Sequence, residues 1–252
     1  FQKLIQQFHQ HTQHLYPLTP YYNQLLRDYQ KEGYQWLRTL YELGFNGVLA
    51  DDMGLGKTLQ VIALLDQLET NKPSLVVCPS SLIYNWEDEV HKFSQTLPVT
   101  CIVSDANTRK TMIHAICGKH LYVTSYDYIR RDIELYDAIE FEYVILDESQ
   151  YIKNQKTKNA ISVKQLHALH KLALSGTPIE NSLAELWSVF DFLMPQYLYN
   201  YHYFQKKFET DIVKNQDQKK IQQLQKMVSP FILRRNKKDV LTELPEKIEQ
   251  TI

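Results

Sequence analysis

Short apolar runs alternate with amphipathic stretches through the first two thirds of the chain. The runs have the length of strands, and in the stretches between them apolar residues recur at the three- and four-residue spacing of a helix. The predicted strands are residues 47–50, 75–78, 99–103, 121–124, 142–146 and 171–174, and the predicted helices between them are residues 57–70, 82–94, 106–117 and 157–169. This alternation predicts an α/β fold in which helices cover both faces of a mostly parallel sheet.

The pattern differs on either side of this alternating region. Before the first strand, apolar residues from Leu26 to Leu43 predict a helix, and the segment ahead of it is polar. After the last strand, the pattern becomes helical and rich in aromatic residues, and it then returns to a strand-like run. We therefore predict four parts, which are a lead-in and linker (1–20), an α/β lobe (21–182), a helical insertion (183–228), and a return strand with a further linker (229–252).

Length and composition are consistent with a folded α/β domain, but the net charge gives no sign of nucleic-acid binding. A chain of 252 residues with 44% hydrophobic residues can form one large domain or two small ones, with a sizeable core. The formal net charge of −1 provides no overall basic field, which is the usual electrostatic signature of a nucleic-acid-binding protein. The nine histidines show no metal-binding spacing, and His167 and His170 are predicted on a helix surface.

The cysteines and the apolar runs bear on location. Cys78, Cys101 and Cys117 are scattered and odd in number, which predicts buried thiols in a reducing compartment, in the cytoplasm, the nucleoid or the nucleus. No apolar run is long enough to span a bilayer and the first residues do not form a signal peptide, so we expect no membrane partner. Because the chain begins at Phe1, we expect it to be a piece of a longer protein.

A glycine-containing turn joins the first predicted strand to the next helix, in the stretch VLADDMGLGKTLQ at residues 48–60. Backbone N–H groups at a helix N-terminus are unpaired and partly positive, so a phosphate group can bind there. Gly54 and Gly56 would let the backbone wrap closely around that phosphate. Lys57 would reach the β- and γ-phosphates of a nucleotide, and the Thr58 hydroxyl would bind Mg²⁺.

The stretch departs from the full Walker A pattern G-x-x-x-x-G-K-[ST], because Asp51 occupies the first glycine position. A turn before an ordinary helix is therefore the alternative. A second stretch, EYVILDESQ at residues 142–150, supplies the carboxylates that a nucleotide site needs. Asp147 would hold Mg²⁺, through a water molecule, and Glu148 would act as the general base for the attacking water. For this acidic pair alone, a solvated loop is the alternative.

Taken together, the two stretches resemble motifs I and II of the SWI/SNF family of DNA-dependent ATPases, a branch of the superfamily-2 helicases. In that family an acidic residue occupies the first loop position, so Asp51 fits the resemblance. LLRDYQKEGYQWL at residues 25–37 resembles the family's adenine-recognition motif, with Gln30 as the residue that reads the base. PFILRRNKKDVLTELPEK at residues 230–247 resembles the signature that closes the family's first lobe. The resemblance covers about residues 21–252.

The resemblance implies a RecA-like three-layer fold, ATP as the nucleotide and Mg²⁺ as its metal ion. It implies that Lys57 and Glu148 are catalytic and that Thr58 and Asp147 contact the metal ion. The nucleotide-binding residues that it implies are Arg27, Gln30, Met53, Gly54, Leu55, Gly56, Lys57, Thr58 and Gln150.

Three further stretches resemble the family's motifs for gripping nucleic acid and sensing the nucleotide. They are residues 76–93 (motif Ia), 122–132 (motif Ib) and 172–193 (motif III and the helices after it). Neutral hydroxyl and N–H groups in them could hold the phosphates of double-stranded DNA without sequence preference and without a large charge. The residues expected to contact DNA are Ser80, Ser81, Asn85, Trp86, Thr124, Ser125, Tyr126, Lys153 and Asn154, and those expected to couple the γ-phosphate to the DNA are Ser175, Gly176 and Thr177. For each residue alone, a helix cap or a turn is the alternative.

The resemblance implies a lobe of a motor that moves on double-stranded DNA and remodels protein–DNA complexes. A superfamily-2 enzyme that separates strands and a non-catalytic docking module are the alternatives. The family has a second RecA-like lobe, which carries arginines that complete the ATP site, and we expect this chain to be the first lobe alone. We therefore expect the chain alone to bind ATP weakly and to hydrolyse it negligibly.

A basic run near the end of the chain has two possible roles. Arg234 and Arg235, with Lys237 and Lys238, could contact phosphate, or they could dock on acidic residues of the lobe itself. The sequence does not distinguish these roles, and we do not expect the two arginines to replace those of the second lobe.

Overall fold

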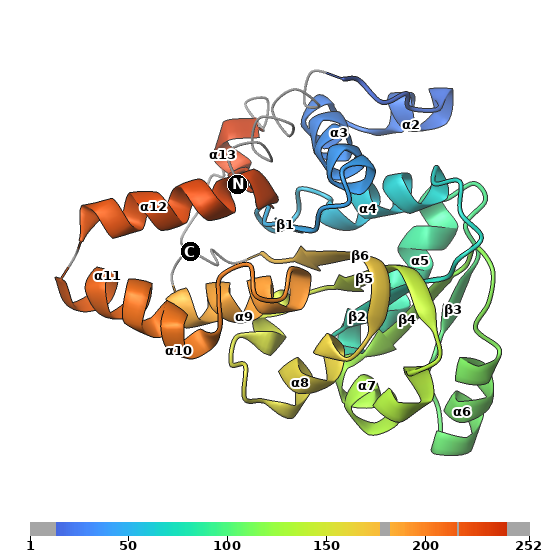
Figure 1. Ribbon diagram of the computed structural model, residues 1–252. Helices are drawn as coiled ribbons and strands as arrows, with labels where there is room; N and C mark the ends of the chain where they lie inside the picture. Colours follow the sequence, from blue (N-terminus) through green and yellow to red (C-terminus); the bar gives the residue numbers. More distant parts are fainter. Residues whose placement is uncertain (1–13, 177–181, 216, 241–252) are drawn as a thin grey trace, which may run out of the picture.

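A single parallel sheet forms the centre of the lobe (Figure 1). The structure is a computed structural model that describes residues 14–176, 182–215 and 217–240. In these residues the strands are β1 (Gly47–Leu49), β2 (Ser74–Cys78), β3 (Val99–Cys101), β4 (Leu121–Ser125), β5 (Glu140–Leu146), β6 (His167–Leu174) and β7 (Ile232–Leu233). Their spatial order is β3-β4-β2-β5-β6-β1-β7, and every neighbouring pair is parallel. The predicted mostly parallel α/β fold is confirmed.

Helices cover both faces of this sheet. On one face lie α3 (Asp28–Glu42), α4 (Lys57–Asp66) and α5 (Ile83–Phe93), and on the other lie α6 (Ala106–His114), α7 (Tyr126–Asp132), α8 (Lys158–Lys164) and α9 (Leu183–Leu193) (Figure 1). Alternate residues of the strands supply the two apolar layers, because successive side chains of a strand point to opposite faces. Val48 packs in one layer and Leu49 in the other, and both are fully buried. These are the three layers of a RecA-like fold.

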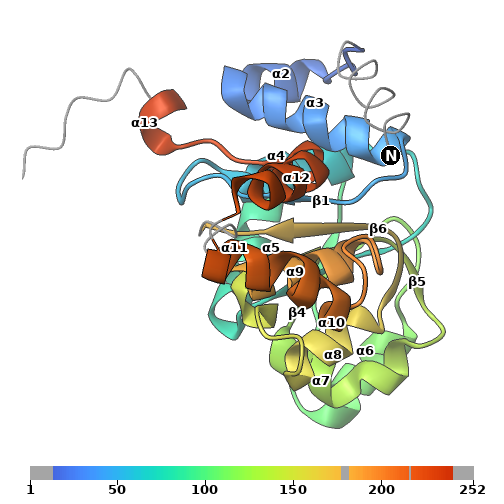
Figure 2. The ribbon, with the colours of Figure 1, turned by 60° about the vertical axis from the view of Figure 1, so that its left-hand side comes forward.

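The segment after β6 is helical, as its aromatic-rich pattern predicted. Besides α9 it contains α10 (Tyr201–Phe204), a π-helical turn (Gln205–Glu209), α11 (Thr210–Asn215) and α12 (Gln218–Val228), which gather at one end of the molecule (Figures 1 and 2). Phe190, Phe204 and Leu224 from this segment belong to the same buried cluster as one face of the sheet. The helical segment is therefore packed onto the sheet through a continuous core.

The remaining elements are short. They are helix α2 (Pro20–Leu25), helix α13 (Lys237–Val240), and single 3₁₀ turns at Ser80–Leu82, Ile133–Tyr136, Ser149–Ile152 and Ser229–Phe231. Residues 1–13 of the predicted lead-in (1–20) and residues 241–252 of the predicted return strand and linker (229–252) lie outside the described residues. Within the described ranges, no helix combines the length and the apolar character that crossing a membrane requires.

One predicted helix is partly wrong. The segment 157–169 was expected to be helical, but α8 ends at Lys164 and β6 begins at His167. The amino-terminal part of β6 pairs with the early part of β5, where His170 lies opposite Tyr143. This pairing overrides the local helical spacing, and it also places His167 and His170 on a strand. The His170 ring packs against both Tyr41 and Tyr143, with ring centroids 4.5 and 5.1 Å away.

The cysteine prediction is correct for two residues and wrong for the third. Cys78 and Cys101 are buried, but Cys117 follows the end of α6 in an exposed loop. The predicted helix at 106–117 ends at His114, so Cys117 is not held against the core.

We expect only Cys117 to react with iodoacetamide in the native chain. Burial raises the pKa of Cys101 to about 12 and raises the pKa of Cys78 further, so both thiols stay protonated as well as inaccessible. Mass spectrometry of briefly labelled protein should find one modified thiol, and Cys117→Ser should remove it. Rapid labelling of two or three thiols in folded protein would contradict this arrangement.

Candidate nucleotide site

The phosphate loop connects β1 to α4 at the carboxyl edge of the sheet. Gly54 and Gly56 have φ values of +84° and +75°, in the left-handed region that glycine adopts without strain. Gly56 is the residue before α4, and Lys57 is the first residue of that helix. The unpaired N–H groups of the first turn of α4 therefore open onto the loop, as phosphate binding requires.

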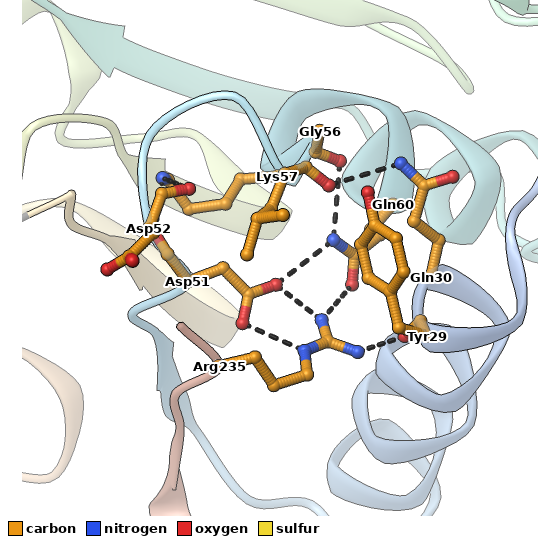
Figure 3. Close-up of polar contacts among 9 residues, drawn as sticks. Tyr29, Gln30, Asp51, Asp52, Gly56, Lys57, Gln60 and Arg235 are labelled. Atoms are coloured by element: carbon orange, nitrogen blue, oxygen red, sulfur yellow. Dashed lines mark hydrogen bonds and ion pairs between the residues drawn. The ribbon is translucent and has the colours of Figure 1, made fainter. Parts of the chain in front are cut away.

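The Lys57 side chain lies inside the loop. Its Nζ donates a hydrogen bond to the backbone carbonyl of Asp51, at 2.6 Å (Figure 3). Burial lowers the pKa of Lys57, and the nearby carboxylates of Asp51 and Asp147 oppose this shift. Lys57 thus holds a partly desolvated positive charge at the position where the sequence predicted a phosphate contact.

The predicted carboxylates lie directly after β5. Asp147 Oδ2 accepts a hydrogen bond of 2.9 Å from Trp86 Nε1, and the Asp147 carbonyl accepts one of 2.7 Å from the Tyr126 hydroxyl. Burial raises the pKa of Asp147, and the Trp86 hydrogen bond works against that rise. The carboxylate is therefore fixed in orientation and poorly solvated, and a nearby cation would stabilise it.

Glu148 has an unusual backbone for a residue other than glycine. Its φ is +52°, in the left-handed region, which occurs in proteins mainly where the surrounding structure enforces it. Gln150 Nε2 donates a hydrogen bond of 2.6 Å to Glu148 Oε2. Gln150 thus contacts the predicted base, and its Oε1 is buried without a hydrogen-bond partner among the described residues.

These groups face a common cleft of about 320 Å³. Lys57, Thr58, Asp147 and Glu148, which the sequence predicted to act together, all line it. Glu89 of α5 also lines the cleft, and the sequence analysis missed it. Burial and the charge of Asp147 raise the pKa of Glu89, while a hydrogen bond with Thr58 lowers it. Its position three residues after Trp86, on the same face of a helix, could have revealed it.

The cleft fits Mg²⁺ bound together with a nucleotide. Among the described residues no group of three or more His, Cys, Asp or Glu side chains is arranged to hold a metal ion. Mg²⁺ is commonly held by one or two carboxylates together with water and substrate phosphates, and a complete protein cage is not needed. Asp147, with its half-buried carboxylate, and the Thr58 hydroxyl match that type of site.

The residue predicted to read the base lies beside the loop. Gln30 Nε2 donates a hydrogen bond of 3.1 Å to the Leu55 carbonyl, and Gln30 Oε1 accepts one of 3.0 Å from the Arg27 amide. A Cβ atom on Gly56 would lie 2.5 Å from Gln30 Nε2, so the close approach requires glycine. The Arg27 side chain and the Met53 side chain are exposed nearby. The roles of these residues toward a nucleotide remain predictions.

The predicted DNA contacts divide into two groups. Ser80, Ser81, Asn85, Lys153 and Asn154 are exposed at or near the carboxyl edge of the sheet. The first two border a second cleft, of about 250 Å³.

The other four predicted contacts have buried side chains. Trp86, Thr124, Ser125 and Tyr126 are at most 2% exposed, although Tyr126 also borders the second cleft. Trp86 and Tyr126 donate hydrogen bonds to Asp147, Thr124 Oγ1 donates to the Ile102 carbonyl, and Ser125 caps α7. These side chains therefore support the site and the fold, and their contact with DNA stays a prediction.

The predicted coupling residues approach the loop from β6. Ser175 is buried, and its amide donates a hydrogen bond of 3.2 Å to the Leu49 carbonyl. A Cβ atom on Gly176 would lie 2.9 Å from Met53 Cγ and 3.9 Å from Lys57 Nζ. Thr177 lies outside the described residues.

Within the basic run at 234–238, the Arg235 side chain docks on the lobe itself. The Arg235 guanidinium forms an ion pair with the buried Asp51 carboxylate (Figure 3), whereas Arg234 is exposed. The sequence left open whether these basic residues contact phosphate or dock on the lobe. For Arg235, the ion pair with Asp51 shows docking.

Comparison with known proteins shows the family of this chain. Residues 29–252 match the SNF2-related domain family. The chain is 41% identical over 249 residues to a TATA-binding protein-associated factor from Arabidopsis thaliana, with 89% of this chain and 12% of that protein covered. It is 42% identical over 228 residues to a protein from Mycoplasma genitalium described as an uncharacterized ATP-dependent helicase, with 88% of this chain and 22% of that protein covered.

A solved structure gives the same result in three dimensions. The structure of the SWI2/SNF2 ATPase core from Sulfolobus solfataricus in complex with double-stranded DNA is 40% identical to this chain, with a TM-score of 0.79. The match covers 89% of this chain and 48% of that one. This chain thus spans between 12% and 48% of the length of these three relatives.

A parallel sheet that brings a glycine loop, a lysine and an acidic pair to one edge is the arrangement of a RecA-like domain. The chain belongs to the SNF2-related family.

We expect Trp86→Phe to weaken the Mg²⁺ dependence of nucleotide binding. Loss of the indole donor removes a hydrogen bond that lowers the pKa of Asp147, so this carboxyl is protonated more readily and holds a cation less well. The Mg²⁺ concentration at half-maximal binding of a fluorescent ATP analogue should rise about tenfold, as on loss of other supporting contacts around a metal ligand. The effect should grow as the pH is lowered.

Tyr84→Phe is the matched control for this measurement. Tyr84 lies on the same helix and its side chain is 60% exposed, so its hydroxyl does not support Asp147. Equal Mg²⁺ midpoints for Trp86→Phe and Tyr84→Phe would show that the indole does not tune this carboxylate.

Proposed function

We propose that this chain binds ATP with Mg²⁺ and acts as one ATP-binding lobe of a motor that moves along double-stranded DNA. The observation that carries the proposal is the meeting of Lys57, Thr58, Asp147 and Glu148 around one cleft. The family to which the chain belongs supports it, because its solved relative from Sulfolobus is called an ATPase core.

The phosphates of ATP would bind at the N-terminus of α4, enclosed by the loop of Gly54 and Gly56. Lys57 would then leave the Asp51 carbonyl and donate to the β- and γ-phosphates. When bound, Mg²⁺ supplies positive charge that neutralises the phosphate oxygens and helps to orient them. Thr58 and Asp147 are the residues of this chain that would hold it.

Glu148 would accept the proton of the water that attacks the γ-phosphate. The hydrogen bond from Gln150 holds the Glu148 carboxylate, and Glu148 lines the same cleft as Lys57. Asp147 and Glu148 would thus divide two tasks between adjacent carboxylates, with the first binding the metal ion and the second moving a proton.

The chain alone should hydrolyse ATP slowly. In related phosphate-loop enzymes an arginine that stabilises the transition state contributes ~10³–10⁵ in rate. Arg235 is engaged with Asp51, so it cannot supply that charge from its present position. We propose that such arginines come from a second lobe, as the resemblance to SWI/SNF enzymes implies.

We propose that the DNA partner is bound through its phosphates. Ser80, Ser81, Asn85, Lys153 and Asn154 present hydroxyl, amide and ammonium groups to solvent near the ATP cleft. Phosphate contacts carry no sequence information, which suits an enzyme that steps along any DNA. The Sulfolobus relative in complex with double-stranded DNA supports this partner.

The work done by the motor would be the remodelling of protein–DNA complexes. The relative from Arabidopsis named as a TATA-binding protein-associated factor supports a protein target on DNA. Such substrates imply an intracellular location. The helicase-like name of the Mycoplasma relative favours strand separation as a second candidate, and a strand-displacement assay on a protein with both lobes separates the two.

We expect Lys57→Ala and Glu148→Gln to separate binding from hydrolysis. Lys57→Ala removes a direct phosphate contact, so its affinity for a fluorescent ATP analogue should fall at least tenfold. Glu148→Gln should bind the analogue as the unsubstituted chain does, because an amide cannot accept the water proton but leaves the phosphate contacts intact. In a protein with both lobes, its ATP turnover should fall by 10²-fold or more, roughly the contribution of general base catalysis.

Circular dichroism of both variants is the control for folding. Near-normal turnover by Glu148→Gln would show that Glu148 is not the base, and no analogue binding by the unsubstituted chain would refute the proposed function itself.

We expect Ser80→Ala combined with Ser81→Ala to weaken DNA binding without changing ATP binding. The change removes exposed hydroxyl donors at the edge of the sheet, and binding through phosphates should also weaken as the salt concentration rises. Fluorescence anisotropy with two duplexes of unrelated sequence should show the same loss for both. The matched control is Thr157→Ala, whose exposed hydroxyl caps α8. A loss confined to one duplex would contradict phosphate-directed binding.

A further inference from the structure

We infer that Arg235 is a positioning residue for the nucleotide site. From the segment that follows β7 it holds Asp51 at the start of the phosphate loop, and it thereby couples the loop to the path of the chain beyond the sheet. The inference rests on the proposed binding of ATP, and it assigns to the basic run a role in setting the geometry of that site.

The Arg235 side chain makes its contacts with three separate parts of the site (Figure 3). Its Nε donates to Asp51 Oδ1 at 2.9 Å and one terminal nitrogen donates to Asp51 Oδ2, so the pair is bidentate. The same terminal nitrogen donates to Gln60 Oε1 at 2.8 Å, and the other donates to the Tyr29 carbonyl. One guanidinium thus joins the phosphate loop, helix α4 and the start of helix α3.

This ion pair is buried, so it constrains both partners strongly. The Asp51 side chain is fully buried, and that of Arg235 is 10% exposed. Removing one partner of a buried pair leaves the other charge desolvated and uncompensated. Gln60 Nε2 also donates to Asp51 Oδ2 at 3.2 Å, which leaves the carboxylate few alternative orientations.

The backbones of the two segments are also bonded to each other. The Ala50 amide donates to the Leu233 carbonyl at 2.7 Å, and the Asp52 amide donates to the Arg235 carbonyl at 3.1 Å. The Lys237 amide donates to the Asp52 side chain at 2.9 Å. These bonds continue the parallel pairing of β1 and β7 past the ends of both strands, so residues 233–237 and 50–52 form one ribbon.

Asp51 connects this ribbon to the phosphate-binding lysine. Its carbonyl accepts the 2.6 Å hydrogen bond from Lys57 Nζ, while its carboxylate is held by Arg235. A shift of the segment carrying Arg235 would therefore move the carbonyl on which Lys57 rests. The position of the segment after β7 and the availability of Lys57 for phosphate are thus linked through one residue.

A glycine inside helix α3 makes room for the network. A Cβ atom on Gly33 would lie 1.8 Å from Gln60 Oε1 and 2.8 Å from an Arg235 terminal nitrogen. Glycine is a poor helix former, so its presence in the interior of α3 is explained by this close approach. Both atoms are the ends of flexible side chains, and they can be displaced without moving the backbone.

Gly33→Ala should therefore displace the hydrogen-bonded side chains of Arg235, Asp51 and Gln60 without removing any of them. Alanine favours the helix, which offsets part of the cost of disturbing the buried ion pair, so circular dichroism at the temperature of the binding assay should still show a folded chain. Binding of a fluorescent ATP analogue should nevertheless weaken roughly tenfold, the scale seen when a supporting contact of a binding site is lost. If the network only stabilised the fold, the affinity measured on fully folded Gly33→Ala would equal that of the unsubstituted chain.

Arg235→Met tests the same link directly. It should weaken binding of the fluorescent ATP analogue about as much as Gly33→Ala does. Arg234→Met is its matched control, because Arg234 is the neighbouring arginine and is exposed. In an Asp51→Asn background, Arg235→Met should change the affinity by less than twofold, since its effect passes through Asp51. Amide hydrogen exchange of residues 50–57 without nucleotide should be faster in Arg235→Met and in Gly33→Ala than in Arg234→Met.

Unchanged affinity and unchanged exchange in Gly33→Ala would overturn the inference, even where Arg235→Met fails to fold. Equal effects of Arg235→Met with and without Asp51→Asn would also overturn it. If the unsubstituted chain failed to bind the analogue, the proposed function would fail, and the exchange comparison alone would then decide whether Arg235 holds the loop.

Discussion

Parallel strand pairing is the constraint on which the site depends. Because all strands in the described residues run in the same direction, the residue that follows each strand emerges at one edge of the sheet. β6 lies between β1 and β5, so the phosphate loop after β1 and the acidic pair after β5 are separated by only one strand. Lys57 and Asp147, distant in sequence, consequently line one cleft. The fold alone thus places the positive charge of Lys57 and the negative charge of Asp147 in the same cleft.

The same edge carries an unusual density of poorly solvated charge. Burial raises the pKa of Asp147 and of Glu89 and lowers that of Lys57, so each of these groups is less stable in its charged form than it would be in water. Charged groups are kept in such a state where function requires it, since a bound polyphosphate and its metal ion can compensate both signs at once. Asp51 differs, because its charge is already compensated by Arg235. The site therefore has a fixed, neutralised side at the base of the loop and an uncompensated side that faces the cleft.

Local sequence was sufficient for the parts of the site that a single segment defines. The loop with Lys57 and the pair Asp147 and Glu148 were predictable because glycine, lysine and acidic residues follow apolar strands at characteristic spacings. The phase of α5 would also have placed Trp86 inward, since Ile83, Trp86 and Val90 are its buried residues, but the resemblance to a DNA-contact motif outweighed that periodicity. β6 was mispredicted at its start because pairing with β5, which local spacing cannot reveal, decides its structure. The bond between Arg235 and Asp51 joins residues 184 positions apart, so local sequence could not reveal it. The one local sign of a close approach was Gly33, a glycine within a helix.

The two-residue strand β7 has a consequence for how the lobe is made. β1 is flanked by β6 and β7, and both of its neighbours lie far later in the chain. While a ribosome is still producing the residues between them, Val48 and Leu49 belong to an apolar segment whose backbone amide and carbonyl groups have no strand to pair with. Unpaired apolar edges are the surfaces through which nascent chains associate wrongly. Contacts between distant residues also slow folding, because the intervening chain must first be brought together. The strand that carries the phosphate loop is thus enclosed late, because its two partners, β6 and β7, are the last strands of the sheet to be made.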